Sequence, residues 1–182
     1  TKEYKYNDEY SVFEIDDDIL KRYNNFLQQH IDRTKLIGRV SNPDCTGFLA
    51  IHRKTDRAVG FEWTIVSHKK EYRHDNFLVP KNEGLLFNAY VTEEHRGKGV
   101  FRKLKTTAAN YLLNVRRCNN AFSVVESLNK SSINANQQIG SIEVGRNYLI
   151  KVLKRNVFSI TILDGKKISF EYVLTGSKKI KI

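Results

Sequence analysis

The chain has 182 residues, 40% of them hydrophobic and 28% charged, which fits one globular domain with a sizeable core over residues 1–182. No apolar run approaches the roughly 20 residues that a membrane-spanning helix needs, and residues 1–14 hold no apolar signal core, so we expect no membrane span and a cytoplasmic location. The net charge of +11 comes from short, dispersed Lys and Arg clusters, which favours a solvated basic surface over a nucleic-acid-binding one.

The first half of the chain predicts a helix followed by an antiparallel hairpin. Three aspartates at 16–18 precede apolar residues at helical spacing, and acidic side chains stabilise the first turn of a helix. Two apolar runs of strand character follow, joined by a short polar link. The predicted elements are a short strand at 12–15, a helix at 16–31, a loop at 41–44, strands at 48–52 and 58–66, and a polar loop at 68–83.

The second half alternates strands and helices and then becomes all β. An apolar strand at 85–91 leads into a glycine-containing turn and a helix at 100–115, and Asp164-Gly165 is typical of a hairpin turn. The other predicted elements are strands at 121–126, 144–153, 157–163 and 168–174 and a short helix at 131–139, with 156–163 expected to pair with the strand at 121. This order predicts a mixed α/β fold of the α+β kind.

The turn between the strand and the helix reads Arg96-Gly97-Lys98-Gly99-Val100-Phe101. Glycines let a backbone approach an anion closely, and the first N–H groups of a helix have no partner within it. Together with the side chains of Arg96, Lys98 and Arg102, these N–H groups predict a site for a pyrophosphate. The stretch lacks the Lys and Ser or Thr of a Walker A loop and the third glycine of a dinucleotide fingerprint, so neither of those sites is indicated.

A second polar motif follows the predicted strand at 121–126. It comprises Asn129, Ser132, Asn136 and Gly140, at the first position and three, seven and eleven residues later. The two motifs together resemble those of the GNAT superfamily of N-acetyltransferases, whose turn has Arg or Gln, two residues, Gly, one residue and then Gly or Ala. Phe101 departs from the last position of that turn, and Asn136 stands where the family often has Tyr.

The resemblance implies a GNAT-like mixed, mostly antiparallel central sheet flanked by helices, with a splayed pair of parallel strands. It also implies acetyl-CoA as the cofactor, with the pantetheine arm in the wedge between those strands and the backbone N–H of Tyr90 polarising the thioester carbonyl. The cofactor-binding residues that it implies are Ala89, Tyr90, Val91, Arg96, Gly97, Lys98, Gly99, Val100, Phe101, Arg102, Asn129 and Ser132.

Two residues are assigned to catalysis on the same resemblance. A carboxylate commonly takes the proton of the acceptor amine, and Glu126, near the mouth of the wedge, is the first candidate, unless it is simply a solvent-facing carboxylate at a strand end. Glu83 and Glu62 are weaker candidates, Glu62 because its place between two aromatic residues predicts that it faces solvent. In the family a Tyr often reprotonates the thiolate, and Asn136 at that position can donate a hydrogen bond but cannot supply a titratable proton.

The resemblance predicts an acyl-CoA-dependent N-acetyltransferase that acts on a primary amine of a small molecule. An amino sugar nucleotide is the acceptor that the net charge suggests. Two alternatives stay open: a non-catalytic CoA- or nucleotide-binding sensor, which Asn136 favours, and a basic nucleic-acid-binding protein. We expect no metal, because Cys45, His68 and His74 match no zinc spacing, and we expect Cys45 and Cys118 to be free thiols. A homodimer formed through the terminal hairpin also stays open.

Overall fold

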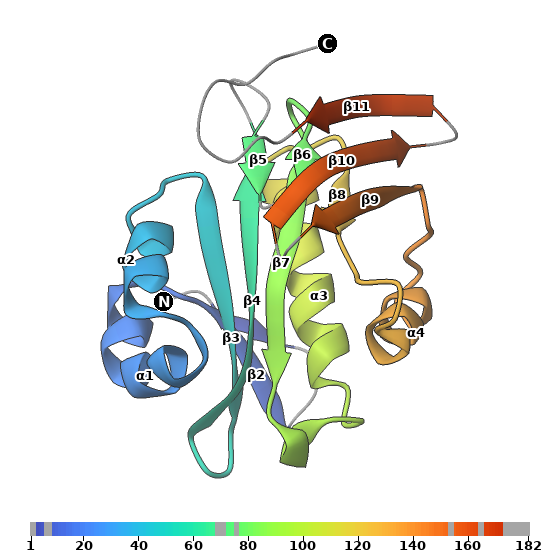
Figure 1. Cartoon of the computed structure of the whole chain (residues 1–182). Coiled ribbons are helices and arrows are strands. Elements are labelled where there is room, and N and C mark those ends of the chain that lie inside the picture. The colour runs from blue at the N-terminus through green and yellow to red at the C-terminus, as the bar shows by residue number, and fades with distance from the viewer. Residues whose placement is uncertain are drawn as a thin grey trace.

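The computed structural model describes residues 3–5, 9–67, 72–74, 77–152, 155–163 and 166–172 (Figure 1), with side chains over 9–67 and 79–144. The turn at Asp164-Gly165 and the side chains of His68 and His74 lie outside that description. The predicted mixed α/β fold is confirmed. No helix of the described part is both long and apolar enough to cross a membrane.

The helices and strands follow the predicted order closely. The strands are β1 (Glu3–Lys5), β2 (Tyr10–Glu14), β3 (Cys45–His52), β4 (Arg57–Val66), β5 (Tyr72–His74), β6 (Phe77–Val79), β7 (Gly84–Val91), β8 (Ala121–Ser123), β9 (Gly145–Val152), β10 (Arg155–Leu163) and β11 (Lys166–Tyr172). The helices are α1 (Asp17–His30), α2 (Arg33–Val40), the 3-10 turn η1 (Glu93–His95), α3 (Val100–Asn110), its π-helical continuation η2 (Tyr111–Val115) and α4 (Lys130–Gln138).

The main sheet has six strands in the order β1-β2-β3-β4-β7-β8. All neighbouring strands are antiparallel except β7 and β8. These two are paired only from Gly84 and Ala121 to Leu86 and Ser123, whereas β7 continues along β4 as far as Val91. The parallel strands therefore separate beyond Leu86, which confirms the predicted splayed pair.

Helices cover both faces of this sheet (Figure 1). α1 begins where the Asp16 side chain accepts a hydrogen bond from the Ile19 N–H at 2.9 Å, and it buries Leu27 against the face that carries Phe61. α3 packs on the opposite face, where Leu104 is fully buried. Burying a leucine side chain stabilises a fold by about 2 kcal/mol, so both helices are held to the sheet mainly by apolar contact.

Two predicted strand arrangements are wrong. The strand expected at 121–126 ends at Ser123, and Val124 is 54% exposed, because β7 diverges at this point and leaves no neighbour to continue the ladder. The segment expected to pair with it forms β10 instead, between β9 and β11 in a separate three-stranded sheet. Glu126 therefore lies three residues beyond the end of β8, in a turn.

Several further elements were not predicted, among them β1. The region 68–83, expected to be a loop, contains the hairpin of β5 and β6. α2 was missed because its sequence has few apolar residues and a glycine at position 38. The helix forms because the Asp32 carboxylate accepts from the N–H groups of Thr34 and Lys35, and because Leu36 is buried against α1 and the sheet.

Candidate active site

The predicted phosphate turn joins the end of β7 to the start of α3. Gly97 has φ 73° and Gly99 has φ 82°, conformations that glycine adopts without steric penalty. A Cβ atom at either position would find no heavy atom within 4 Å, so the backbone borders open space. Val100 is buried and Phe101 half-buried, and no described side chain caps α3. The first N–H groups of a firmly anchored helix are therefore available to an anion.

The basic side chains of the turn play two different parts. Arg96 donates from Nε to the carbonyl oxygen of Val91 at 3.2 Å, and its guanidinium lies 3.4 Å from the carboxylate of Glu93. It therefore braces the turn from within. Lys98 and Arg102 are exposed, one on the turn and one on the first turn of α3. These two cations are accessible to a phosphate, and Arg96, although bonded within the turn, is exposed as well.

A strand from the N-terminal end of the chain holds the turn in place. The hydroxyl oxygen of Tyr10 on β2 lies 2.8 Å from Nδ1 of His95 in η1. Burial raises the pKa of Tyr10 and lowers the pKa of His95, which the positive charge of Lys98 lowers further. A neutral imidazole can accept a hydrogen bond from the phenol O–H, so this contact fixes η1 on the sheet. The sequence pattern gave no signal for the pair.

β7 carries a bulge where the two parallel strands have separated. Its register on β4 shifts between Phe87 and Tyr90, so that Asn88 and Ala89 together oppose Glu62. Asn88 adopts φ 51°, and its side chain accepts a 2.7 Å hydrogen bond from an arginine of α2. The bulge is thus held from the α2 side, and the ladder to β4 is interrupted at Ala89.

The backbone of Val91 faces the open side of β7. Thr92 donates its N–H to the Val59 carbonyl on β4 at 2.9 Å, and alternate residues of an antiparallel strand direct their backbone groups to the same neighbour. The N–H of Tyr90 accordingly points toward β4, and that of Val91 points away from it. Ala89 is exposed at the bulge. Of the three predicted pantetheine contacts, Val91 is therefore the one whose N–H is directed to the open side of β7, while its carbonyl accepts from Arg96. Contacts by Ala89 and Tyr90 stay predictions.

The second motif closes α4 and ties it to the end of β8. Asn129 caps the helix by accepting from the Ser132 N–H at 3.0 Å, and Gly140 follows the helix at φ 86°. Asn136 is buried; its amide donates to the Ser132 carbonyl at 2.8 Å and accepts from the Ser123 hydroxyl at 3.2 Å. These contacts give the motif a structural role, and cofactor contacts by Asn129 and Ser132 stay predictions.

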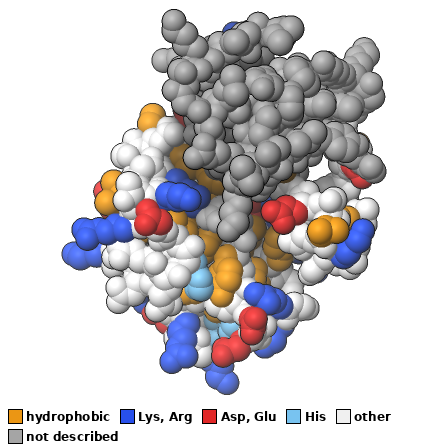
Figure 2. All heavy atoms as spheres, in the orientation of Figure 1, with side chains coloured by type: hydrophobic (Ala, Val, Ile, Leu, Met, Phe, Trp, Pro, Cys, Tyr) orange, Lys and Arg blue, Asp and Glu red, His pale blue; other side chains and the backbone are white. Residues whose placement is uncertain are grey.

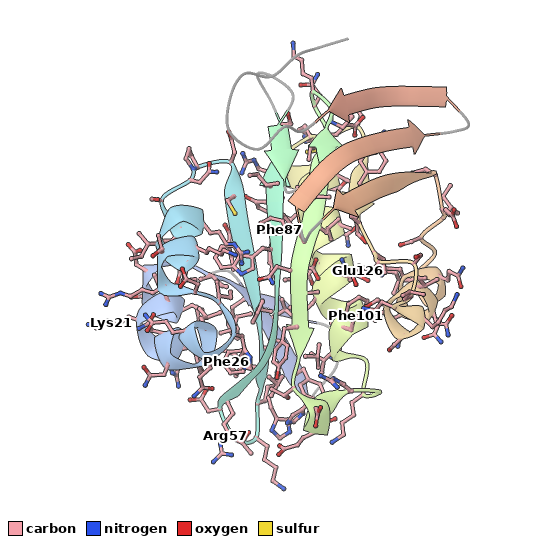
Figure 3. The ribbon with its side chains drawn as sticks, in the orientation of Figure 1. Lys21, Phe26, Arg57, Phe87, Phe101 and Glu126 are labelled. Atoms are coloured by element: carbon pink, nitrogen blue, oxygen red, sulfur yellow. The ribbon has the colours of Figure 1, made fainter. Side chains whose placement is uncertain are left out.

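Two of the candidate bases lie at opposite ends of the parallel strands: Glu126 after the end of β8, and Glu83 just before the start of β7. Glu126 is exposed in the turn after β8, where its backbone carbonyl accepts from the Asn129 N–H at 2.9 Å. Figure 3 shows it between α3 and α4. Glu83 accepts from both the backbone and the side chain of Asn120, at 2.6 and 3.1 Å. Glu83 is therefore committed to joining the starts of β7 and β8, and the catalytic role of Glu126 stays a prediction.

Glu62 does not face solvent as predicted. It is fully buried between β4 and α3, and its Oε1 lies 2.9 Å from Nζ of Lys105, which is only 5% exposed. Oε2 has no hydrogen-bond partner among the described residues. Burial raises the pKa of Glu62 to about 7, because desolvation outweighs the attraction of the Lys105 ammonium. The alternation rule failed because helices cover both faces of the sheet.

The raised pKa of Glu62 predicts a specific pH dependence of stability. The folded state holds this proton up to about pH 7, whereas an unfolded glutamate releases it near its ordinary value of 4.5. Folding therefore takes up a proton between these values, and the free energy of unfolding should fall as the pH rises from about 4.5 to about 7, by on the order of 3 kcal/mol at most. Urea denaturation of the wild type and of Glu62→Gln across this range should show a slope that the variant lacks. Parallel curves would contradict the prediction.

Comparison with known proteins agrees with this geometry. The sequence model of the acetyltransferase (GNAT) family matches residues 6–140. No curated protein matches the chain by sequence. Among solved structures, the aminoglycoside acetyltransferase AAC(6')-Iy with a CoA-linked bisubstrate analogue aligns with a TM-score of 0.62 at 18% identity, over 80% of this chain and 99% of that one.

Two other solved structures show the same fold. A ribosomal-protein-alanine N-acetyltransferase from Brucella melitensis biovar Abortus 2308 has a TM-score of 0.57 at 14% identity, over 79% of this chain and 99% of that one. The aminoglycoside 6'-N-acetyltransferase AAC(6')-IG from Acinetobacter haemolyticus has a TM-score of 0.58 at 15% identity, over 78% and 97%. The family's sequence model matches most of the chain, and these enzymes share the chain's fold. The chain therefore belongs to the GNAT family of acetyltransferases, whose acyl donor is acetyl-CoA.

Proposed function

We propose that the protein transfers an acetyl group from acetyl-CoA to a primary amine of a small molecule. The observation that carries the proposal is the uncapped N-terminus of α3 behind Gly97 and Gly99, placed beside the part of β7 that has separated from β8. One feature can hold a pyrophosphate and the other an extended arm with amide groups. Few other ligands need an anion site at a helix N-terminus and, next to it, an open strand for an extended chain.

The residues present fit acetyl-CoA. The N–H groups of Phe101 and Arg102, with the side chains of Lys98 and Arg102, bind the pyrophosphate. The outward N–H of Val91, with the backbone of Ala89 at the exposed bulge, binds the pantetheine arm. The N–H of Val91, rather than that of Tyr90, polarises the thioester carbonyl. When bound, the donor supplies an acyl group activated as a thioester.

The small-molecule class of the acceptor is also part of this proposal. The AAC(6') enzymes of the same fold are aminoglycoside acetyltransferases, and this chain's charge of +11 adds a nucleotide-linked amino sugar to the candidates. We further propose a cytoplasmic location, supported by the free thiols of Cys45 and Cys118, of which the latter is buried.

Calorimetry and a thermal shift with acetyl-CoA test the cofactor site. A ligand at 100 to 1,000 times its dissociation constant stabilises the folded state by about 3–4 kcal/mol, so the melting temperature should rise clearly with acetyl-CoA and less with ADP. CoA thiol release should then be followed with kanamycin, a UDP-linked amino sugar, tyramine and a peptide with an N-terminal alanine. Saturable release with one of these amines establishes the transferase.

A non-catalytic sensor is the second candidate. It is favoured by Asn136, which is buried with both ends of its amide hydrogen-bonded and which has no proton to give the leaving thiolate. The sensor predicts acetyl-CoA binding without thiol release for every amine in the panel. Absence of acetyl-CoA binding would contradict both functions.

A further inference from the structure

Four aromatic and imidazole rings form a wall on the face of the sheet that carries α1. The wall consists of Phe26 and His30 from α1, Phe61 from β4 and Tyr90 from β7. The ring centroids of His30 and Tyr90 are 3.9 Å apart at an interplanar angle of 29°, and those of Phe26 and His30 are 5.1 Å apart. Figure 2 shows histidine and hydrophobic side chains next to one another at the centre of this face, and Figure 3 shows Phe26 on the side of α1 toward the sheet.

The wall stands beside the expected position of the acyl group. Tyr90 lies between Ala89, which is exposed at the bulge, and Val91, whose N–H points to the open side of β7. Its side chain lies on the α1 face because it pairs with Phe61, which stacks on it at 5.7 Å. The imidazole of His30 stacks on the ring of Tyr90, and Tyr90 belongs to the strand that would hold the thioester. Only the Tyr90 ring therefore separates the imidazole from that strand.

His30 is free to react with a ligand. It is exposed, and among the described residues its ring nitrogens make no hydrogen bond and no ion pair. Its ring contacts are Phe26, Phe61 and Tyr90, of which only Tyr90 is titratable. The nearby carboxylate of Asp32 accepts from N–H groups at the start of α2. His30 is also the last residue of α1, so its side chain stands at the end of the helix beside the sheet.

The carboxylates considered from the sequence are placed less well for the same task. Glu62 lies on the α3 face and is paired with Lys105. Glu83 is bonded to Asn120 at the start of β7, and Glu126 lies beyond the end of β8. None of them is found in the wall of rings beside Tyr90.

We propose that His30 is the catalytic base, an inference that rests on the proposed acetyl transfer. A ring nitrogen of His30 takes a proton from the acceptor amine as the amine nitrogen forms a bond to the acetyl carbon. The carbon–sulfur bond breaks, and its electron pair leaves on the sulfur of CoA. The thiolate takes a proton from water, and the exposed imidazolium returns its proton to the solvent. The products are the acetamide and CoA.

Two substitutions separate proton transfer from ring stacking. His30→Phe keeps a ring on Tyr90 without a basic nitrogen, and His30→Gln keeps a hydrogen-bonding group without a useful base. With the best amine of the panel, both should lower kcat/KM by about 100-fold or more, as removal of a general base typically does, and should leave acetyl-CoA affinity unchanged. Gln29→Ala, at the neighbouring exposed position, is the control that should behave as the wild type.

The pH profile and chemical rescue decide the assignment. The wild-type kcat/KM should decline on the acid side as the base is protonated, and both variants should lose that decline. Imidazole added to His30→Ala should restore part of the rate. A variant within threefold of the wild type, or with its pH profile, overturns the inference while the proposed function stands. A wild type that binds acetyl-CoA but acetylates none of the amines overturns both.

Discussion

Replacing Lys105 with methionine should lower the free energy of unfolding by about 3–5 kcal/mol at pH 8. The substitution leaves the Glu62 carboxylate fully buried without its only described partner, the ammonium 2.9 Å away. At pH 8 this carboxylate must either stay charged in a low-dielectric interior or take up a proton from a solvent that holds few, and both outcomes cost stability. At pH 5 the loss should be smaller, because the raised pKa of Glu62 keeps the carboxyl protonated there.

A second substitution shows whether the buried charge is the cause. The double variant Glu62→Gln/Lys105→Met carries no charge at this position and should recover most of the lost stability, since replacing both members of a buried pair is often close to neutral. Lys21→Met, an exposed lysine on α1 labelled in Figure 3, should change stability by no more than about 0.5 kcal/mol. Equal losses in the single and double variants would mean that packing, not charge, dominates. Chemical denaturation at both pH values provides the measurement.

Replacing Gly99 with glutamate should weaken acetyl-CoA binding by at least 100-fold, or about 2.7 kcal/mol. Gly99 is the N-cap of α3 at φ 82°, a conformation that is strained for a residue with a Cβ. Its surroundings are open, so the fold should survive, but the carboxylate would compete for the N–H groups that are proposed to bind the pyrophosphate. Calorimetry with acetyl-CoA measures the loss.

Gly38→Glu is the matched control for this substitution. Gly38 lies exposed in α2, and a Cβ there also meets no atom within 4 Å, so the same change of charge is introduced away from the turn. This variant should bind acetyl-CoA within threefold of the wild type. Normal binding by a folded Gly99→Glu would remove the turn from the cofactor site, and equal losses in both variants would point to overall charge.

Local patterns were sufficient to predict the elements that lead to the proposed cofactor site. The apolar run at 85–91, the two glycines after it and the helix from Val100 are adjacent in sequence, so their order already determines the strand, turn and helix. The hairpin of β3 and β4 was predictable for the same reason. Such features depend on neighbours a few residues away, and these are visible in a sequence.

The features that were not predicted depend on contacts between distant segments. Glu62 was expected to face water because its neighbours in sequence are apolar. Alternation along a strand shows which residues share a face, but it does not show that helices cover both faces of the sheet. The strand at 121 was expected to continue because its residues are apolar, whereas its length is set by where β7 turns away. His30 and Tyr90 meet only once α1 has packed on the sheet.

The hydrogen bond between Tyr10 and His95 has a consequence for the order of folding. It joins residues 85 positions apart, so the entropy of closing that long loop must be offset before η1 is held against β2. α3 can form early from local contacts, whereas the turn in front of it becomes rigid only when β2 has joined the sheet. A nascent or partly unfolded chain would therefore contain the complete glycine motif and still bind nucleotide poorly, which makes acetyl-CoA a reporter of the finished sheet rather than of the motif itself.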